Sequence, residues 1–514
     1  MNSGKISDKS IHAAVLQHDK DKLKELLLEL KFVFKDHDSE PSFVEETGNA
    51  YELKLEDAET ILNNQDVKVR QFGSYCIAAR FRDLASKALI DAYLSETVDY
   101  NKEHLIKAVS LLEKPGGIDR LHGRLSDLLV LLKGARSESH VHYIKEARSL
   151  LSLIRRFMPH RSFTGDKLDN EVILTTNRNF RELTLKEIKG LPKKTFNAGV
   201  MVRCDDISKV SQIRTYEELL FVPPFDEERF GSFGKDEEIT RVYVKDHLAP
   251  YIFERMKAGD RGNALPVSFR LDIKGISVSE KEDTLQKALS QAVEEASEYE
   301  LINIRNDFDI QIRFVARKTG ILKPLIRFFD PRDERFSYKT TDIAAGIKPY
   351  LAALICRLCG EYMFEDANVL DPFCGAGTLL VERDRFLKTG YLFGSDVYPA
   401  ACLAAEKNLK CAGLSGRSKI INRDFLSLEH KEPFDEMITD LPFETEKKTE
   451  KELDTLFGAL FVKARSLLKP GAFMFVYTRN PGLLKKHITK NKAQVIKCFE
   501  ISKREDAFLF ILKN

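Results

Sequence analysis

Two short stretches of this chain contain residue types that can bind a cofactor and a planar amine. In the first, the apolar run Asn368-Val369-Leu370 enters the turn Asp371-Pro372-Phe373-Cys374-Gly375-Ala376-Gly377-Thr378. The second is Asp440-Leu441-Pro442-Phe443. Glycine lets the backbone approach a bulky ligand closely, whereas an acid followed by a proline and an aromatic residue presents hydrogen-bond acceptors and a stacking ring. Together the two stretches predict methyl transfer to a nitrogen of a nucleobase.

The first stretch predicts the binding of S-adenosylmethionine. A nicotinamide or flavin enzyme normally has Gly-x-Gly-x-x-Gly after its first strand, but no third glycine follows Gly375 and Gly377, and there is no Walker lysine. Asp396 and Asp424 follow later apolar runs, and ligands of such sheets lie beyond the carboxyl ends of the strands. We expect Asp396 to bind ribose hydroxyls and Asp424 to lie near the adenine. The predicted cofactor-binding residues are Asp371, Pro372, Phe373, Cys374, Gly375, Gly377, Thr378, Asp396 and Asp424.

The second stretch suits an exocyclic amine, which is a poor nucleophile because its lone pair is delocalised into the base. The Asp440 carboxylate and the Leu441 carbonyl can accept the amine hydrogens, Pro442 can fix the turn, and Phe443 can stack on a flipped base. We predict these four residues to be catalytic, with in-line positioning supplying most of the rate. No metal or covalent nucleophile is expected, since a sulfonium methyl is already activated. The alternative is a strand that ends in a proline turn over a core phenylalanine.

Composition and cysteine usage exclude several classes of protein. A chain of 514 residues with 43% hydrophobic and 31% charged residues is typical of a globular protein of two to four domains. Eight scattered cysteines and no apolar leader favour a reduced, cytoplasmic setting. The longest apolar run, near Tyr350 to Leu358, is too short to span a membrane. Cys356 and Cys359 lack the second cysteine pair of a zinc site, so we expect them to pack a helix.

The spacing of apolar residues divides the chain into three predicted domains. Residues 1–165 are expected to be all-α and HEAT-like, 166–335 to be α+β, and 336–514 to be a Rossmann-like α/β domain. The HEAT-like interpretation depends on Asp66-Val67-Lys68-Val69-Arg70, in which the aspartate would cap a helix and the arginine would bridge neighbouring repeats. An irregular helical bundle is the alternative. The polar outer faces of this domain suit docking to RNA or to a protein partner.

The same spacing predicts where individual helices and strands lie. The N-terminal domain is expected to contain helices at 19–34, 55–62, 67–93 and 104–112. The central domain is expected to contain strands at 171–176, 198–203, 267–273, 308–314 and 325–329, with helices at 179–189 and 279–297. The C-terminal domain is expected to contain strands at 368–370, 391–396, 418–422, 436–439 and 472–477, helices at 378–386 and 400–413, and a terminal hairpin of 493–501 and 507–512.

Residues 166–514 resemble the THUMP-domain RNA methyltransferases, which modify guanine at its exocyclic N2 in tRNA and ribosomal RNA. The resemblance rests on the two stretches described first, and on Arg335-Phe336-Ser337-Tyr338 leading to Ile347-Lys348-Pro349-Tyr350-Leu351-Ala352, which matches the segment that joins THUMP to the catalytic domain. It implies a ferredoxin-like subdomain from about Asn170, a THUMP fold that binds RNA, and a class I methyltransferase domain.

The resemblance also gives a basic segment of the central domain a role in RNA binding. The net charge of the chain is only +2, which does not indicate a polyanion partner. Taken alone, the basic residues of this segment are most simply interpreted as a solvated face. In a THUMP protein the cluster is expected to contact RNA, because neutralised phosphates supply much of the affinity for a nucleic acid. The predicted RNA-binding residues are Arg313, Arg317, Lys318, Lys323 and Arg327.

We therefore predict a methyltransferase that forms N2-methylguanosine in RNA, in tRNA rather than ribosomal RNA. The open alternatives are guanine N2 of ribosomal RNA, adenine N6, a glutamine amide, and a non-catalytic RNA-binding scaffold with this fold. Two features depart from the family: Glu444 stands where many relatives have glycine, and the N-terminal helical domain is not a usual part. Glu382 can lie on a helix surface or support the cofactor loop.

Overall fold

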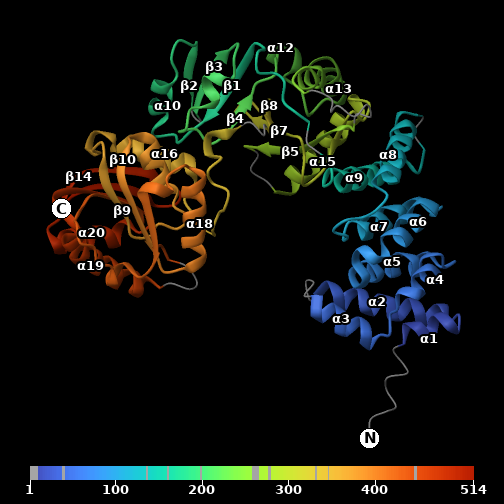
Figure 1. The fold of residues 1–514 in the computed structure, drawn as a ribbon. Helices are drawn as coiled ribbons and strands as arrows, with labels where there is room; N and C mark the ends of the chain where they lie inside the picture. The colour runs from blue at the N-terminus through green and yellow to red at the C-terminus, as the bar shows by residue number, and fades with distance from the viewer. Residues whose placement is uncertain are drawn as a thin grey trace, which may run out of the picture. The chain divides into compact units, whose positions relative to one another are not determined.

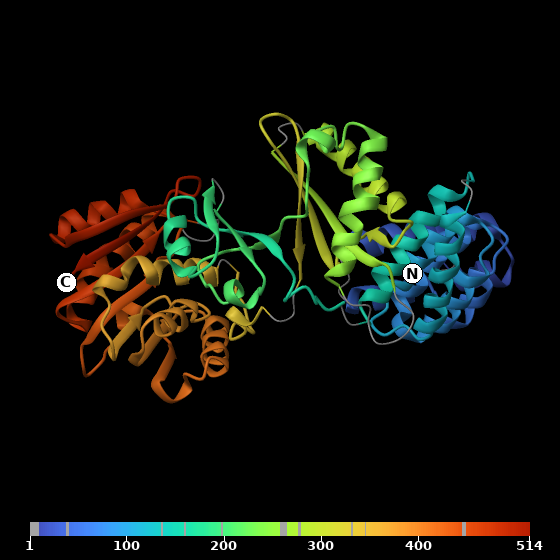
Figure 2. The ribbon, with the colours of Figure 1, turned by 90° about the horizontal axis from the view of Figure 1, so that it is seen from above.

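The computed structural model divides into two compact units (Figure 1 and Figure 2). One unit combines Met1–Thr164 with Pro223–Phe329, and the other combines Gly165–Val222 with Asp330–Asn514. The predicted central domain is therefore shared between the two units, and the three-domain division stays a prediction. The structure describes residues 10–36, 41–134, 137–158, 161–196, 199–256, 265–275, 279–329, 333–344, 346–444 and 449–514.

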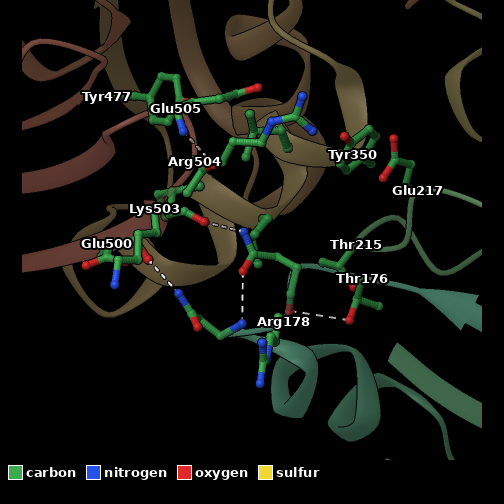
Figure 3. A pocket seen from close by; sticks show the side chains of 16 residues that line it. Thr176, Arg178, Thr215, Glu217, Tyr350, Tyr477, Glu500, Lys503, Arg504 and Glu505 are labelled. Atoms are coloured by element: carbon green, nitrogen blue, oxygen red, sulfur yellow. Dashed lines mark hydrogen bonds between the residues drawn. The ribbon is translucent and has the colours of Figure 1, made fainter. Parts of the chain in front are cut away.

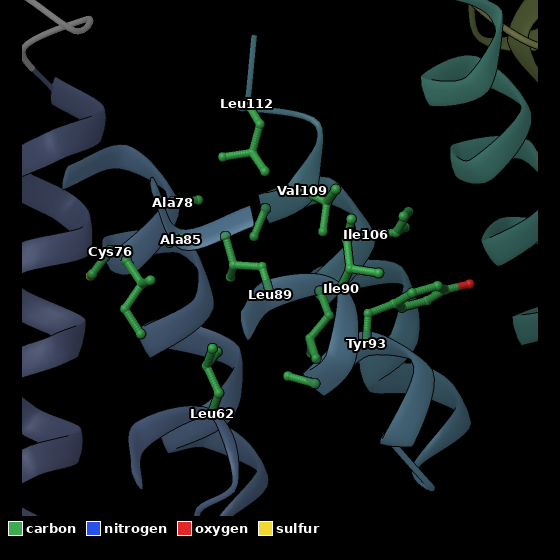
Figure 4. Packing of buried hydrophobic residues seen from close by; sticks show 14 of the residues in the cluster. Leu62, Cys76, Ala78, Ala85, Leu89, Ile90, Tyr93, Ile106, Val109 and Leu112 are labelled. Carbon is green, nitrogen blue, oxygen red and sulfur yellow. The ribbon is translucent and has the colours of Figure 1, made fainter. Parts of the chain in front are cut away.

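The first unit begins with a succession of helices, as predicted, whose apolar faces share one core. Leu89, Ile90, Ile106 and Val109 pack between two neighbouring helices and are each at most 1% exposed (Figure 4). The helices are α1 (Ile11–Leu16), α2 (Lys20–Asp36), α3 (Pro41–Ala50), α4 (Ala58–Leu62), α5 (Val67–Phe81), α6 (Ser86–Ser95), α7 (Asp99–Val109), α8 (Ile118–Lys133) and α9 (His140–Arg155), with 3-10 turns at Leu55–Asp57 and Arg82–Ala85.

The residues that suggested a repeat make the expected local contacts. Asp66 caps α5 by accepting a hydrogen bond from the backbone N–H of Lys68 at 2.6 Å, and Val69 is fully buried. Arg70 donates to both carboxylate oxygens of Glu96, at 2.8 and 2.7 Å, and so joins α5 to the end of α6. These contacts are those predicted, whereas the assignment to HEAT repeats stays a prediction.

A four-stranded sheet and its helices complete the first unit. The strands pair in the order β8-β7-β5-β6, with β7 antiparallel to β8 and parallel to β5. Two ion pairs attach α9 to this part of the unit: Arg155 with Asp309 is buried, and Arg148 with Glu294 is partly buried. The elements are α12 (Glu227–Phe230), α13 (Glu237–Tyr243), a π-helix (Val244–Leu248), α14 (Ala249–Glu254), β5 (Val267–Lys274), α15 (Ser279–Ala296), β6 (Leu301–Asn303), β7 (Ile310–Ala316) and β8 (Leu322–Phe328).

The second unit contains a small antiparallel sheet and a larger, mostly parallel one. The small sheet has the order β2-β3-β1-β4. Strands β2 and β4 were not predicted, because each has at most four residues and gives too short a pattern. The elements are β1 (Asn170–Thr175), α10 (Arg181–Glu187), β2 (Lys193–Phe196), β3 (Gly199–Cys204), α11 (Ser208–Ser211) and β4 (Leu219–Phe221).

The larger sheet is a doubly wound, Rossmann-like sheet, as predicted, with the order β11-β10-β9-β12-β13-β15-β14. The strands are parallel from β11 to β13, and β15 is antiparallel to both of its neighbours, which confirms the terminal hairpin. The strands are β9 (Ala367–Asp371), β10 (Thr389–Asp396), β11 (Ser418–Asn422), β12 (Phe434–Asp440), β13 (Leu468–Thr478), β14 (Gln494–Ser502) and β15 (Ala507–Lys513).

Helices cover both faces of this sheet. Those on one face are α16 (Pro349–Cys359), α17 (Thr378–Phe386) and α18 (Pro399–Cys411), and those on the other are α19 (Glu450–Leu467) and α20 (Pro481–Asn491). Short 3-10 turns lie at Glu334–Phe336, Gly360–Tyr362, Ser415–Arg417 and Phe425–Ser427. Cys356 and Cys359 are fully buried in α16 among apolar side chains, where they pack the helix. Among the helices described, none combines the length and apolar character needed to cross a bilayer.

Buried charges attach the small sheet to the larger one. Glu382 of α17 is 1% exposed and accepts hydrogen bonds from Arg214, at 2.9 and 2.7 Å, and from the Tyr338 hydroxyl at 2.7 Å. Arg335 lies 3.6 Å from the centroid of the Tyr216 ring. The suggestion that Glu382 lies on the helix surface is therefore wrong, because this carboxylate is the acceptor that joins three segments of the unit.

A buried ion pair joins β12 to α17, and its removal tests the importance of this packing. Arg383 and Glu436 are both fully buried, and Arg383 donates to both carboxylate oxygens at 2.8 Å. Glu436→Gln should lower the free energy of unfolding by about 3 kcal/mol, because it leaves a buried cation without its counter-charge. Denaturant unfolding followed by circular dichroism measures the change.

The matched control is Lys469→Met, which breaks the more exposed pair with Asp435 on the same strand. Its expected cost is below about 1 kcal/mol, since exposed pairs contribute little. Equal costs for the two variants would contradict a role for the buried pair.

Candidate active site

The sheet brings three of the predicted acids to one edge. Asp371, Asp396 and Asp440 are the last residues of β9, β10 and β12, which are adjacent parallel strands. The carboxyl ends of parallel strands meet at the same edge. The acids also influence one another, because both Asp396 and Asp440 contribute to the raised pKa of Asp371.

The glycine turn after β9 binds the acid at the end of β10. Gly375 and Gly377 have positive φ angles of 51° and 75°, which are accessible to glycine at little cost. The Asp396 carboxylate accepts hydrogen bonds from the backbone N–H groups of Gly375 and Tyr398, each at 3.0 Å. A Cβ atom on Gly377 would lie 3.3 Å from the Cβ of Ala405, so this glycine also lets α17 begin close to α18.

Asp371 shapes the loop rather than facing solvent. It is 1% exposed and accepts a hydrogen bond from the backbone N–H of Phe373 at 3.1 Å. Burial raises its pKa to about 8, against the lowering effect of the hydrogen bond from the Phe373 backbone. A side chain in this position can hold the turn, and it remains uncharged over much of the physiological range of pH.

The other predicted cofactor residues divide into buried and accessible groups. Pro372, Cys374 and Thr378 are buried, and burial raises the pKa of the Cys374 thiol well above its usual range. Asp424 is exposed, but its carboxylate accepts from the backbone N–H of Leu426 at 2.9 Å and caps a 3-10 turn. The structure thus gives Asp424 a structural contact, and its role near an adenine stays a prediction.

The residues beside Asp396 fit an adenosine-type ligand. The Asp396 carboxylate is partly exposed and retains acceptor capacity beyond its two backbone hydrogen bonds. Val397 and Tyr398, which follow it, are 51% and 65% exposed. A carboxylate that can bind hydroxyl groups next to exposed apolar side chains that can cover a ring is suitable for S-adenosylmethionine.

Asp440 is half-buried, and one of its carboxylate oxygens is a buried, unused acceptor. Its Oδ1 atom is buried and makes no hydrogen bond to any residue that the structure describes. Burial raises the pKa of Asp440 to about 7, and the positive charge of Arg479 acts in the opposite direction. An unpartnered buried acceptor is costly, so the site is suited to a ligand that donates a hydrogen bond there.

The residues after Asp440 form a turn against the next strand. The backbone N–H of Leu441 donates to the carbonyl of Tyr477 at 2.9 Å, and Leu441 is 1% exposed. Phe443 is half-buried rather than a core residue, and the Arg479 guanidinium lies 4.2 Å from its ring centroid. One face of Phe443 is therefore covered, and a base can stack on the opposite face.

Sequence reasoning did not assign Tyr477 and Arg479 to the site. Tyr477 is paired in register with Asp440 across β12 and β13, and Arg479 follows directly after β13. Their position directly after the apolar run 472–476 could have indicated that they lie at the end of a strand, as it did for the four acids. Neither residue belongs to a recognisable motif, because their contribution arises from strand pairing.

The structure places three of the five predicted RNA-binding residues on one face of β7 and β8. Residues that pair directly across two antiparallel strands face the same side, as do alternate residues of one strand. Lys323 pairs with Val315 and Arg327 with Gln311, and both partners alternate with Arg313, so the three cations share one face. Arg317 forms an ion pair with Glu227 at 2.5 Å, and Lys318 is exposed in the turn between the strands. Their contact with RNA stays a prediction.

Comparison with known proteins assigns a family to part of the chain. Residues 337–504 match the family model described as RMKL-like, methyltransferase domain. The curated relatives include the U6 snRNA (guanine-N(2))-methyltransferase THUMPD2 of Mus musculus, 27% identical over 232 residues, and that of Homo sapiens, 34% identical over 113 residues. The matches cover 44% and 22% of this chain, and 42% and 22% of the two relatives, so less than half of either relative is matched.

Two solved structures match about two thirds of this chain. TrmN from Thermus thermophilus is 18% identical with a TM-score of 0.49, over 67% of this chain and 99% of that one. A structure described as an N6-adenine-specific DNA methylase from Listeria monocytogenes is 14% identical with a TM-score of 0.47, over 67% and 96%. The family model and the curated relatives confirm the resemblance drawn from the sequence: residues 337–504 of this chain are similar to the RMKL-like methyltransferase domain.

Proposed function

We propose that this protein transfers a methyl group from S-adenosylmethionine to the exocyclic N2 of a guanosine in RNA. The observation that supports this most is the buried Oδ1 atom of Asp440, which has no hydrogen-bond partner in the described part of the chain. This residue lies on the strand next to the glycine turn and is followed by the half-buried ring of Phe443. The match to a methyltransferase domain and the guanine-N2 activity in the relatives' names give further support.

In this proposal the edge formed by β9 and β10 holds the cofactor. Asp396 binds the ribose hydroxyls, Gly375 and Gly377 let the backbone approach, and Asp424 lies toward the adenine. S-adenosylmethionine supplies, when bound, a methyl group on a positively charged sulfur. The buried Asp371, Pro372, Phe373, Cys374 and Thr378 segment keeps the turn in shape.

The turn after β12 holds and orients the amine. The Asp440 carboxylate and the Leu441 carbonyl accept the two N2 hydrogens, which directs the lone pair of the nitrogen out of the base plane. Pro442 fixes the turn, and the free face of Phe443 stacks on the base. Methylation requires the amine to lose one proton, and a carboxylate with a pKa of about 7 can accept it at neutral pH.

The rest of the chain is proposed to select the RNA. We assign the HEAT-like helices to docking of RNA or a protein partner, the ferredoxin-like strands β1 to β4 to support of the catalytic domain, and the THUMP-like part with β5 to β8 to RNA binding. The sequence favoured tRNA, whereas the curated relatives are named for U6 snRNA, so both RNAs are candidates.

The identity of the product tests the proposal. The full-length protein is incubated with methyl-labelled S-adenosylmethionine and, separately, tRNA or U6 snRNA transcripts, and the digested nucleosides are identified by mass spectrometry. Label in N2-methylguanosine supports the proposal. Label in adenosine, or none in either RNA or in total RNA, excludes it.

Asp440→Ala should reduce the methylation rate by at least about 100-fold, because the variant lacks the acceptor for the amine. Binding of S-adenosylmethionine, measured by calorimetric titration, should remain within about twofold of the wild type. Asp454→Ala is the matched control, since Asp454 is a half-exposed acid of α19 outside the proposed site, and it should retain full activity. Turnover by Asp440→Ala at the wild-type rate would remove this residue from the mechanism.

The rate should also depend on the ionisation of Asp440. Since the amine binds the charged carboxylate, kcat/KM should rise with pH through about 7 and then level off. Arg479→Gln should move the midpoint upward, because the Arg479 charge lowers the pKa of Asp440. A pH profile with an unchanged midpoint in this variant would show that Arg479 does not act on the carboxylate.

The stability of the free protein should show the opposite dependence on pH. The folded-state pKa of Asp440 lies above its ordinary value of 3.8, so the protonated form favours folding. This contribution is complete below pH 3.8 and is lost as the pH rises through about 7.

Charge reversal on β8 tests the proposed RNA-binding face. Lys323→Glu with Arg327→Glu should weaken binding of the methylated RNA about tenfold and reduce its dependence on salt, because fewer phosphates are neutralised. The control is Lys245→Glu with Lys287→Glu, which reverses two exposed lysines on helices of the same unit. Equal effects of the two pairs, measured by fluorescence anisotropy, would mean that net charge rather than this face determines binding.

A further inference from the structure

A pocket of about 660 Å³ lies in the second unit beside the proposed amine site (Figure 3). It is formed by the loop after β1, the segment before β4, the first turns of α16, the end of β13 and the hairpin between β14 and β15. This volume is within the range of pockets that bind small ligands. Its lining includes the charged residues Arg178, Glu217, Lys503, Arg504 and Glu505 and the phenols of Tyr350 and Tyr477.

Side-chain amides hold the pocket walls together. Asn177 donates from Nδ2 to the carbonyl of Ile501 at 2.7 Å, and Asn179 donates from Nδ2 to the carbonyl of Glu500 at 3.1 Å. Figure 3 shows both hydrogen bonds between the β1 loop and β14. The rings of Phe180 and Phe499 are also in edge contact, with centroids 5.9 Å apart. The pocket is therefore preformed.

The pocket is adjacent to the amine site but on the side away from the cofactor residues. Tyr477 lines the pocket, is paired in register with Asp440 and accepts the hydrogen bond from Leu441. In the sheet, β12 with Asp440 lies between β9 and β10, which carry the cofactor residues, and β13 to β15, which border the pocket. A ligand in the pocket can therefore be continuous with the amine substrate.

The inner and outer parts of the pocket differ in charge. Tyr350 and Tyr477 contribute the phenols of the pocket lining. Burial, and then the negative charge of Glu217, raise the pKa of Tyr350. Three exposed cations lie at the rim, and within the described ranges none of them forms an ion pair: Arg178, Lys503 and Arg504. A ligand with an anionic group at the rim and a ring with hydrogen-bond donors inside matches this arrangement.

We propose that this pocket binds the nucleotide next to the methylated guanosine in an unpaired stretch of RNA. The phosphate lies on the rim cations, and the base lies against Tyr350 with its amino group toward Glu217 or Glu505. This rests on the function proposed above, because only a polynucleotide substrate has such a neighbour. Recognition of flanking nucleotides together with an extruded base is a common way in which enzymes that modify bases select their context.

Charge reversal at the rim tests the pocket. The variant Arg178→Glu/Lys503→Glu/Arg504→Glu should bind the methylated RNA at least about tenfold more weakly than the wild type, in fluorescence anisotropy with labelled tRNA and U6 snRNA transcripts. The slope of log Kd against log salt should fall by about 0.7, which is the contribution of one phosphate contact to a single strand. The affinity for S-adenosylmethionine should not change.

The control is Lys451→Glu/Lys463→Glu/Lys490→Glu, which places the same charge change on α19 and α20, across the sheet from α16. Equal weakening by both variants, or wild-type binding by the rim variant, overturns the pocket proposal. The product assay with the wild type distinguishes failure of the pocket proposal from failure of the proposed function. If the wild type forms N2-methylguanosine but the rim variant binds RNA normally, only the pocket proposal is rejected. If the wild type forms no N2-methylguanosine, the proposed function is rejected.

Crosslinking gives a second measurement that needs no variant. Wild-type protein is irradiated with RNA that contains 4-thiouridine, and crosslinked peptides are identified by mass spectrometry. The proposal expects nucleotide adducts on peptides that contain Arg178, Tyr350 or residues 500–505. Adducts confined to other peptides of the second unit would overturn it.

Discussion

The second unit depends on the burial of acidic groups at the ends of parallel strands. Asp371 is buried and Asp440 is half-buried with a buried Oδ1 atom, and burial raises their pKa values to about 8 and about 7. For Asp440 the rise from 3.8 corresponds to about 4 kcal/mol of preference for the neutral form. Stable packing around these acids must compensate for the free-energy cost of burying them. A ligand that donates a hydrogen bond to the unused acceptor of Asp440 removes part of that cost and gains binding free energy.

Other buried charges provide that packing. Arg383 with Glu436 fixes β12 to α17, and Glu382 joins α17 to Arg214 and Tyr338. The same helix begins at the glycine turn. Helix α17 therefore positions both β12, which carries Asp440, and the glycine turn that binds Asp396. Errors in its position would change the distance between methyl donor and acceptor, on which the rate depends strongly.

The C-terminal domain was the most predictable part of the chain, because long parallel strands and amphipathic helices leave clear apolar patterns. The bounds of α17 and β11 agree with those predicted, and three of the four acids are the last residues of strands, whereas Asp424 caps a 3-10 turn after β11. Short strands such as β2 and β6 were not found, since three or four residues give no period. Glu382, Tyr477 and Arg479 were not assigned because their contacts join residues far apart in the sequence. Folding also divided the predicted central domain between two units.

The central claim is that Asp440 binds the exocyclic amine of guanine, and a double-substitution cycle tests it most directly. RNA with guanosine or inosine at the methylated position is bound to wild-type protein and to Asp440→Ala, since inosine lacks only the N2 amine. We predict that inosine weakens binding to the wild type by about 1–3 kcal/mol and has little effect in the variant, a coupling typical of direct contact. Equal losses in both proteins would contradict the account.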